Sequence, residues 1–487
     1  MNLNNIHKIP GLSYLVLLPV MALAFYIAFI PHVNYPYPVH IDEWVHLAHS
    51  EAMLSAGSTA YTDPFLGQGI VGLSNPLHEV GFHILWGVFQ RLSGLSWMDI
   101  FRYFPGIVFM LTALSVYIMG RREGFGWEAA FFACLVPTTV GIMGPAFLVP
   151  VAMGLLFVPL VIFLAFNLRS AWSYLAVFIL TCSLLSIHIP SATWLVIILA
   201  PYILLNLKGN WRHSLGLGLA LIIPFLVPFP GISNALLPNL KALLTLQPLE
   251  TYIDYPLLIR TYGYLPVGCC LLGTLVLALK GGRKYYGLVL GLLVMLLLLA
   301  IRYTFLYGVH MIYGRGLMFL MLMMGIVAGA GLMWVKKIRL PERLRERLRI
   351  PRPVGENTGR VLCLALVVIT LVICIPARQH IPYYHMIDRY DYEAFSWIGE
   401  NVSDDYGKAL LDPWKATAFC ALTEKKVFTR IHAYPKPRDN KAYAFLNSGC
   451  VDTAFLKDNG ISIVYTRGSC DNPDLTPVRE GVYLLKE

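Results

Sequence analysis

An adjacent pair of carboxylates, Asp42 and Glu43, is the arrangement of residues in this chain best suited to chemistry. The pair follows the first long apolar run, in the stretch HIDEWVH that begins at His40. A carboxylate placed where a membrane segment meets water can accept a proton from an attacking hydroxyl or amine, or orient it. The competing interpretation is structural, because acidic residues in the first turn of a helix complement the helix dipole. The spacing alone leaves both interpretations open.

The same stretch suggests a metal site. On a helix, Asp42, His46 and His49 are spaced i, i+4 and i+7 and would share one face. A carboxylate with imidazoles can hold a divalent cation, and Mg²⁺ or Mn²⁺ is the hypothesis that follows. The alternative is that histidines close to lipid headgroups are only interfacial.

Two arginines are candidates for binding the phosphate of a lipid donor. Arg315, in YGRGL, begins an apolar run and is flanked by glycines that would let another chain approach, and Arg302 ends the preceding run. A guanidinium in such a place suits a phosphate group. The alternative is a cation that reaches from a helix end to the membrane surface. Three further polar residues are candidate substrate or acceptor contacts: Glu79, His78 and His188. The alternative for His188 is structural, because a lone histidine at a helix end commonly is.

Composition predicts where these residues lie. The chain has 487 residues, of which 57% are hydrophobic and only 14% are charged, and its mean hydropathy is +0.62. A soluble domain carries roughly 25% charged residues. Apolar runs of about 17–25 residues are long enough to cross a bilayer. We therefore expect a polytopic α-helical membrane protein with about 11 transmembrane helices, near residues 12–30, 102–119, 127–143, 149–167, 173–188, 191–206, 214–229, 264–279, 286–301, 315–335 and 361–377.

Basic residues predict the topology. They concentrate in alternate loops, most densely in residues 336–352, and the positive-inside rule then places the N-terminus in the cytoplasm. With an odd number of helices the tail lies outside. The basic run is better explained by anionic lipid than by nucleic acid. The expectation is an integral protein of the plasma or inner membrane, with membrane lipids and no nucleic acid among its partners.

Three polar segments should face the outside. They are the first loop (residues 31–101), a second loop (residues 230–263) and the tail. In the first loop we expect a helix over residues 43–54, ended by Gly57, and a second helix over residues 76–92 that lies along the membrane surface. The alternative for the second helix is a true span, which would reverse the side of every later loop.

The expected domains are a transmembrane catalytic domain, residues 1–377, which includes both loops, and a small extracytoplasmic α/β domain, residues 378–487. The tail has helical residues 392–398 and strand-like residues 408–411 and 461–465. The tail also has three cysteines, and whether two of them form a disulfide is open: Cys420, Cys450 and Cys470.

The order of these features resembles the GT-C class of membrane glycosyltransferases, which includes protein O-mannosyltransferases, aminoarabinose transferases and catalytic subunits of oligosaccharyltransferases. The resemblance rests on the acidic pair in a long first loop (IDEWVHLAHSEAMLSAGSTAYTDPFLGQG), the segment NPLHEVGFHILWGVF, the basic turn GRREGFG and the late GRGLMFLMLMMGIVAGAG. It covers about the first 335 residues.

The resemblance implies an inverting glycosyltransferase that takes a sugar from a polyprenyl-phosphate-linked donor at the extracytoplasmic face. By this resemblance, Asp42, with Glu43 beside it, would be the catalytic base or part of the metal and acceptor site. Arg315 would bind the lipid phosphate. The chain also departs from the oligosaccharyltransferase pattern. Residues 141–146, GIMGPA, contain no acid, and the Trp-Trp-Asp-Tyr-Gly signature is absent. Both departures favour a monosaccharide transferase.

Two other classes compete with this interpretation. A transporter or lipid flippase would carry charged residues deep inside its membrane helices, whereas the ionisable residues here gather at helix ends and in loops. A non-catalytic scaffold subunit with a degenerate transferase fold stays open, because the second acidic motif is missing.

Overall fold

The structure is a computed structural model, and it describes residues 17–67, 69–71, 79–139, 141, 143–226, 260–306, 310–347, 351–383, 385–432 and 434–486. His78 and almost all of the predicted loop 230–263 lie outside the described residues.

The chain divides into two compact units. The membrane unit comprises Met1–Val33 and Tyr103–Pro382, and the loop–tail unit comprises Asn34–Arg102 and Tyr383–Glu487. The predicted transmembrane domain includes residues 31–101, whereas by its contacts nearly all of this segment belongs with the tail.

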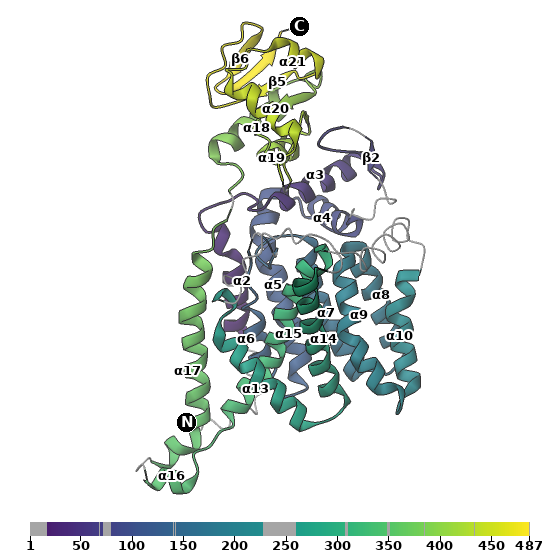
Figure 1. Ribbon diagram of the computed structural model, residues 1–487, viewed down its shortest axis with the longest axis vertical. Coiled ribbons are helices and arrows are strands. Elements are labelled where there is room, and N and C mark those ends of the chain that lie inside the picture. Colours follow the sequence, from purple (N-terminus) through teal and green to yellow (C-terminus); the bar gives the residue numbers. More distant parts are fainter. Residues whose placement is uncertain are drawn as a thin grey trace. The chain divides into compact units, whose positions relative to one another are not determined.

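The membrane unit is built of helices, most of which run side by side in Figure 1. They are α2 (Leu17–Phe29), η2 (Ile30–His32), α5 (Trp97–Arg121), α6 (Gly126–Ala133), α7 (Pro150–Asn167), α8 (Ala171–Ile187), α9 (Ile189–Leu207), α10 (Trp211–Leu226), α13 (Tyr264–Lys280), α14 (Arg283–Phe305), α15 (His310–Lys336), α16 (Glu342–Arg347) and α17 (Arg352–Gln379).

Among the described residues, six of these helices are long and apolar enough to cross a membrane: those of Trp97–Arg121, Pro150–Asn167, Ile189–Leu207, Arg283–Phe305, Tyr313–Lys336 and Gly355–Gln379. Four shorter apolar helices lie at other predicted positions: Leu17–His32, Ala171–Ile187, Trp211–Leu226 and Tyr264–Lys280. The integral membrane character of the protein follows from these helices. The expected number of about 11 spans is supported only in part.

The helix predicted over residues 127–143 is wrong. Helix α6 ends at Ala133, and the described residues between it and α7 form turns and irregular chain. The physical reason is local, since Pro137 has no backbone N–H to donate and Gly141, Gly144 and Pro145 follow within eight residues. An apolar run can therefore meet the length expected of a span without being one helix.

Glycine lets the central helices of the membrane unit approach closely. A Cβ at Gly273 of α13 would lie 2.0 Å from the carbonyl oxygen of Val327, and one at Gly331 of α15 would lie 2.2 Å from that of Cys269. Small residues at such contacts bring two backbones together where the surrounding lipid provides no hydrophobic driving force. Helix α15 is accordingly mostly buried, whereas α17 is mostly exposed.

The loop–tail unit combines surface helices with a small α/β domain. Its elements are α3 (Ile41–Ala56), β1 (Tyr61–Thr62), β2 (Ile70–Val71), α4 (Val80–Ser93), α18 (Arg389–Asn401), β3 (Lys408–Leu410), α19 (Ala416–Thr423), β4 (Lys426–Val427), α20 (Pro437–Asn447), α21 (Thr453–Asp458), β5 (Ile463–Tyr465), β6 (Leu475–Arg479) and β7 (Val482–Leu485). The predicted helix over residues 43–54 is confirmed as α3, and it ends at Gly57, whose φ of 58° is left-handed. The tail helix and both tail strands are confirmed as α18, β3 and β5.

The tail sheet has the strand order β4-β3-β5-β7-β6. Strands β4, β3 and β5 are parallel, and β7 pairs antiparallel with both β5 and β6. The chain passes from β3 through α19 to β4 on one side, and then through α20 and α21 to β5 on the other side of β3. This reversal makes a topological switch point at the carboxyl ends of β3 and β5, the kind of place where open α/β sheets bind ligands.

Several contacts attach the first loop to the tail, among them those of Phe65 and Tyr35. The Val427 N–H donates to the carbonyl oxygen of Phe65 at 2.8 Å. The Tyr35 hydroxyl donates to the carbonyl oxygen of Ile387 at 2.8 Å, and its ring stacks on that of His385 with centroids 4.0 Å apart. These contacts explain why segments far apart in the sequence form one unit.

Candidate functional site

Helix α3 begins with a cap that uses one member of the acidic pair. Glu43 is fully buried, and its Oε2 accepts hydrogen bonds from the backbone N–H groups of Val39 (2.8 Å) and His40 (3.0 Å). In return, the His40 Nδ1 accepts the Asp42 N–H at 3.1 Å. This reciprocal pattern is a capping box. The carboxylate of Glu43 therefore holds the start of α3 in place and positions its neighbour Asp42.

The Asp42 side chain contacts the tail. Its Oδ1 lies 2.8 Å from the Nε2 of His432 and 3.8 Å from the Nδ1 of His40. The Asp42 side chain is 17% exposed and the His432 side chain is 52% exposed. The tail thus brings an exposed imidazole to a mostly buried carboxylate, a pairing that the sequence analysis did not find.

The other two residues of the predicted metal set lie in a different cluster. The Nδ1 of His46 is 3.1 Å from the Nε2 of His83 and 3.7 Å from the Oε2 of Glu79. The Nδ1 of His49 is 2.9 Å from the Tyr61 hydroxyl. Helices α3 and α4 pack together through these side chains.

The metal hypothesis stays a prediction. Throughout the part of the chain that the structure describes, no group of three or more histidine, cysteine or acidic side chains is arranged to hold a metal ion. We derive no chemical step through Mg²⁺ or Mn²⁺.

A cation of the tail also faces this region. Arg430 is largely buried, with its guanidinium carbon 3.9 Å from the centroid of the Phe65 ring. Burial lowers the pKa of Arg430, and the carboxylates of Asp63 and Asp42 act in the opposite direction. Arg430 thus contributes positive charge near Asp42.

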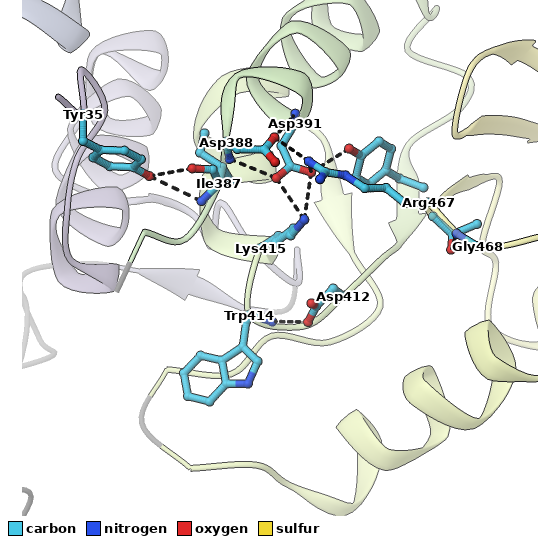
Figure 2. A network of polar contacts seen from close by, with 11 residues as sticks. Tyr35, Ile387, Asp388, Asp391, Asp412, Trp414, Lys415, Arg467 and Gly468 are labelled. Carbon is cyan, nitrogen blue, oxygen red and sulfur yellow. Dashed lines mark hydrogen bonds and ion pairs between the residues drawn. The ribbon is translucent and has the colours of Figure 1, made fainter. Parts of the chain in front are cut away.

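A second polar network holds the tail together around Asp391, which is 1% exposed (Figure 2). The Asp391 carboxylate accepts hydrogen bonds from Lys415 (2.8 Å) and the Tyr465 hydroxyl (2.6 Å), and it forms an ion pair with Arg467 (2.8 Å). Arg467 also bonds Asp388, and this contact holds the pKa of Asp388 well below its usual value. The network fixes the start of α18 against the end of β5.

The switch point of the tail sheet presents an aromatic ring and a carboxylate beside this network. Trp414, which follows β3, is 40% exposed, and in Figure 2 its indole points away from the Asp391 cluster. The Asp412 Oδ1 accepts hydrogen bonds from the backbone N–H of Trp414 and from the hydroxyl of Tyr443, each at 3.0 Å. An exposed indole beside an oriented carboxylate can stack on a sugar ring or a peptide side chain and accept its hydrogen bonds.

In the membrane unit, Arg302 occupies the last turn of α14. It is fully buried, and its Nη1 donates to the carbonyl oxygen of Leu306 at 2.7 Å. Among the residues that the structure describes, neither Nε nor Nη2 of Arg302 has a hydrogen-bond partner. A buried guanidinium with two such nitrogens is well suited to an anion.

The remaining predicted residues lie in other surroundings. Arg315 is half-buried near the start of α15. His188 separates α8 from α9 and is 4% exposed, and its Nδ1 lies 2.6 Å from the Ser191 hydroxyl. His188 thus stabilises the turn between two helices. Asp42 belongs to the loop–tail unit, and Arg302 and Arg315 belong to the membrane unit.

No protein-family model matches this chain, and no curated protein matches its sequence. Solved structures do match. The oligosaccharyltransferase AglB of Archaeoglobus fulgidus, in complex with an inhibitory peptide and a dolichol-phosphate, has a TM-score of 0.60 at 12% identity, over 93% of this chain and 70% of that one. A structure of the same enzyme tethered to an acceptor peptide has a TM-score of 0.59 at 11% identity, over 93% of this chain and 68% of that one.

A second relative by fold is the arabinofuranosyltransferase AftD from Mycobacteria. Its TM-score is 0.55 at 14% identity, and the match covers 97% of this chain and 40% of that one. Identities this low show a shared fold and no more. The chain has the fold of the GT-C class of membrane glycosyltransferases.

Proposed function

We propose that this protein is a glycosyltransferase that moves a sugar from a polyprenyl-phosphate-linked donor to an acceptor at the extracytoplasmic face of the membrane. The observation that carries the proposal is the buried Arg302 guanidinium in a chain with the GT-C fold. Moving a cation out of water without a counter-charge is costly, and a phosphate group at the membrane would supply that charge. The dolichol-phosphate in the AglB complex supports a lipid-linked donor.

In this proposal each group has a separate task. Arg302 binds the donor phosphate and stabilises the charge that develops on it as the sugar leaves, and Arg315 assists. Asp42 acts as the base or orients the acceptor, and Glu43 positions it through the capping box. Among the further candidates, Glu79 and His188 have structural contacts that support only an indirect role.

The tail is proposed to bind the acceptor at its switch point. Trp414 provides an exposed apolar ring and Asp412 a carboxylate that two hydrogen bonds hold in place. We expect Trp414→Ala to raise the KM for the acceptor and to leave the KM for the donor unchanged. Trp172, which is 79% exposed on helix α8, provides the matched control for loss of an exposed indole.

The decisive experiment measures sugar release from a panel of synthetic polyprenyl-phosphate-sugars by the full-length protein in detergent, with and without divalent cation. We expect Asp42→Asn to abolish transfer while the protein stays folded. Arg302→Gln should weaken donor binding by about 2 kcal/mol, roughly 30-fold, because it removes a charged hydrogen-bond donor. Arg360→Gln, an exposed position on α17, is the control.

Two results would contradict the proposal. Full turnover by Asp42→Asn would remove the carboxylate from the reaction, and an unchanged KM for the donor in Arg302→Gln would remove the guanidinium from the donor site. If folded wild-type protein releases no sugar from any donor of the panel, the scaffold interpretation gains support.

A further inference from the structure

The tail contributes a histidine to the carboxylate that the proposed function places at the reaction. His432 and Asp42 are 390 positions apart, and the imidazole Nε2 lies 2.8 Å from the Asp42 Oδ1. An ionised carboxylate only accepts hydrogen bonds, so Nε2 carries the hydrogen in this contact. The other ring nitrogen, Nδ1, then has the lone pair.

Exposure separates the roles of the two side chains. The His432 side chain is 52% exposed, whereas that of Asp42 is 17% exposed. A mostly buried carboxylate behind an exposed imidazole is the arrangement in which the carboxylate fixes the tautomer and stabilises the imidazolium that forms. The imidazole is therefore better placed than the carboxylate to receive a proton from a bulky acceptor.

The charged and titratable neighbours are compatible with that role. His40 lies 3.8 Å from the same carboxylate oxygen, and the oxygen Oε2 of Glu43 is held by the capping box. Arg430, from the same tail segment as His432, adds positive charge near Asp42. Of these groups, the contact to Asp42 is the one that orients the His432 ring.

From this geometry we infer that His432 is the general base for a hydroxyl acceptor and that Asp42 orients its ring; this rests on the proposed function. The acceptor oxygen forms a bond to the anomeric carbon of the sugar, and its proton moves to Nδ1 of His432. The bond between the anomeric carbon and the phosphate oxygen breaks, and the polyprenyl phosphate leaves with the electron pair. The imidazolium then returns its proton to water.

The test compares wild-type protein with His432→Ala, His432→Gln and Asp42→Asn in the transfer assay, at full length and in detergent. We expect His432→Ala to lower kcat by at least 100-fold with an unchanged KM for the lipid donor, because a positioned base contributes about 10²–10⁴ in rate. His432→Gln, which keeps a donor for Asp42 but no base, should be equally slow. The double variant should lose little more than either single variant.

Chemical rescue separates a base from a structural contact. Added imidazole should restore a measurable part of the activity of His432→Ala and none of that of Asp42→Asn. The kcat of wild type should decrease towards acid pH, and this decrease should be absent from His432→Ala. His380→Ala, at an exposed histidine of the membrane unit, is the control and should behave as wild type.

The outcomes distinguish this inference from the proposed function. If wild type transfers sugar and His432→Ala stays within 3-fold of it, or imidazole fails to rescue the variant, the base assignment is wrong and the glycosyltransferase stands. If folded wild type transfers nothing, the proposed function and the base assignment fall together. The contact itself is then still tested, because diethyl pyrocarbonate should modify His432 faster in Asp42→Asn than in wild type, and equal rates would show that the pair does not form.

Discussion

Replacing Asp391 by asparagine removes the negative charge at the centre of the tail network. The substitution keeps the shape of the side chain, but its amide nitrogen would face the cations that now pair with the carboxylate, Lys415 (2.8 Å) and Arg467 (2.8 Å). Breaking a buried ion pair from one side costs about 3–5 kcal/mol. Because the side chains of Lys415 and Arg467 are 22% and 43% exposed, water recovers part of that cost. We therefore expect Asp391→Asn to lower the free energy of unfolding by about 3 kcal/mol, the low end of that range.

This loss should be large enough to measure in the intact protein. For a unit of about 170 residues, each kcal/mol lowers the unfolding temperature by roughly 2–4 °C, so the expected decrease is roughly 6–12 °C. Thermal unfolding of the full-length protein in detergent measures the change. Hydrogen exchange read by mass spectrometry should localise it to α18 and β5, with the membrane helices unaffected.

A second carboxylate on the same helix gives the matched control. Glu393 pairs with Arg389 four residues earlier on the exposed face of α18, where the side chains are 47% and 88% exposed. Water screens such a pair, so Glu393→Gln should leave the unfolding temperature unchanged. A decrease below about 2 °C for Asp391→Asn, or equal effects of the two substitutions, would refute the reasoning that the buried network stabilises the tail.

Two further predictions concern packing and pH. A Cβ at Gly316 of α15 would lie 2.3 Å from the buried Trp194 ring, whereas one at Gly314 would meet no atom of the described residues within 4 Å. Gly316→Ala should therefore destabilise the membrane unit by about 1–3 kcal/mol and Gly314→Ala should not, as thermal unfolding of both variants will show. Because Arg467 depresses the pKa of Asp388 in the folded state, the stability from this contact is complete above about pH 4 and is lost as the pH falls further. The unfolding temperature, measured between pH 3 and pH 7, should therefore drop at the acid end, and it should drop less for the Arg467→Gln variant. Parallel curves of unfolding temperature against pH for wild type and variant would contradict this.

Local rules account for what could be predicted about the fold. Apolar length predicted ten of the helices, and the same rule was wrong for residues 127–143, where Pro137 and the glycines after it decide the backbone. The end of α3 at Gly57 was also readable, since a left-handed glycine acts within one turn. Helix α3 begins at Ile41, two residues before the predicted start, and its first turn contains Glu43, for which the sequence left a structural role and chemistry open.

The candidate site could be predicted only in part. Asp42, Arg315 and Arg302 stood out because a charge beside an apolar run is conspicuous in any sequence. His432 and Arg430 gave no such signal, since they lie in an ordinary polar tail without a motif. The i, i+4, i+7 spacing correctly placed His46 and His49 on one helix, but it could not show that His83 of α4 lies against His46.

The sequence by itself determined that this is a membrane protein, where most of its helices lie and which residues could carry charge at their ends. These properties depend on apolar length, capping and backbone hydrogen bonds between near neighbours. Only the tertiary structure decided that the first loop and the tail form one unit, and that His432 bonds a carboxylate 390 positions away. Such contacts depend on how whole surfaces pack, and the periodic spacing of apolar and polar residues along the chain carries no information about that packing.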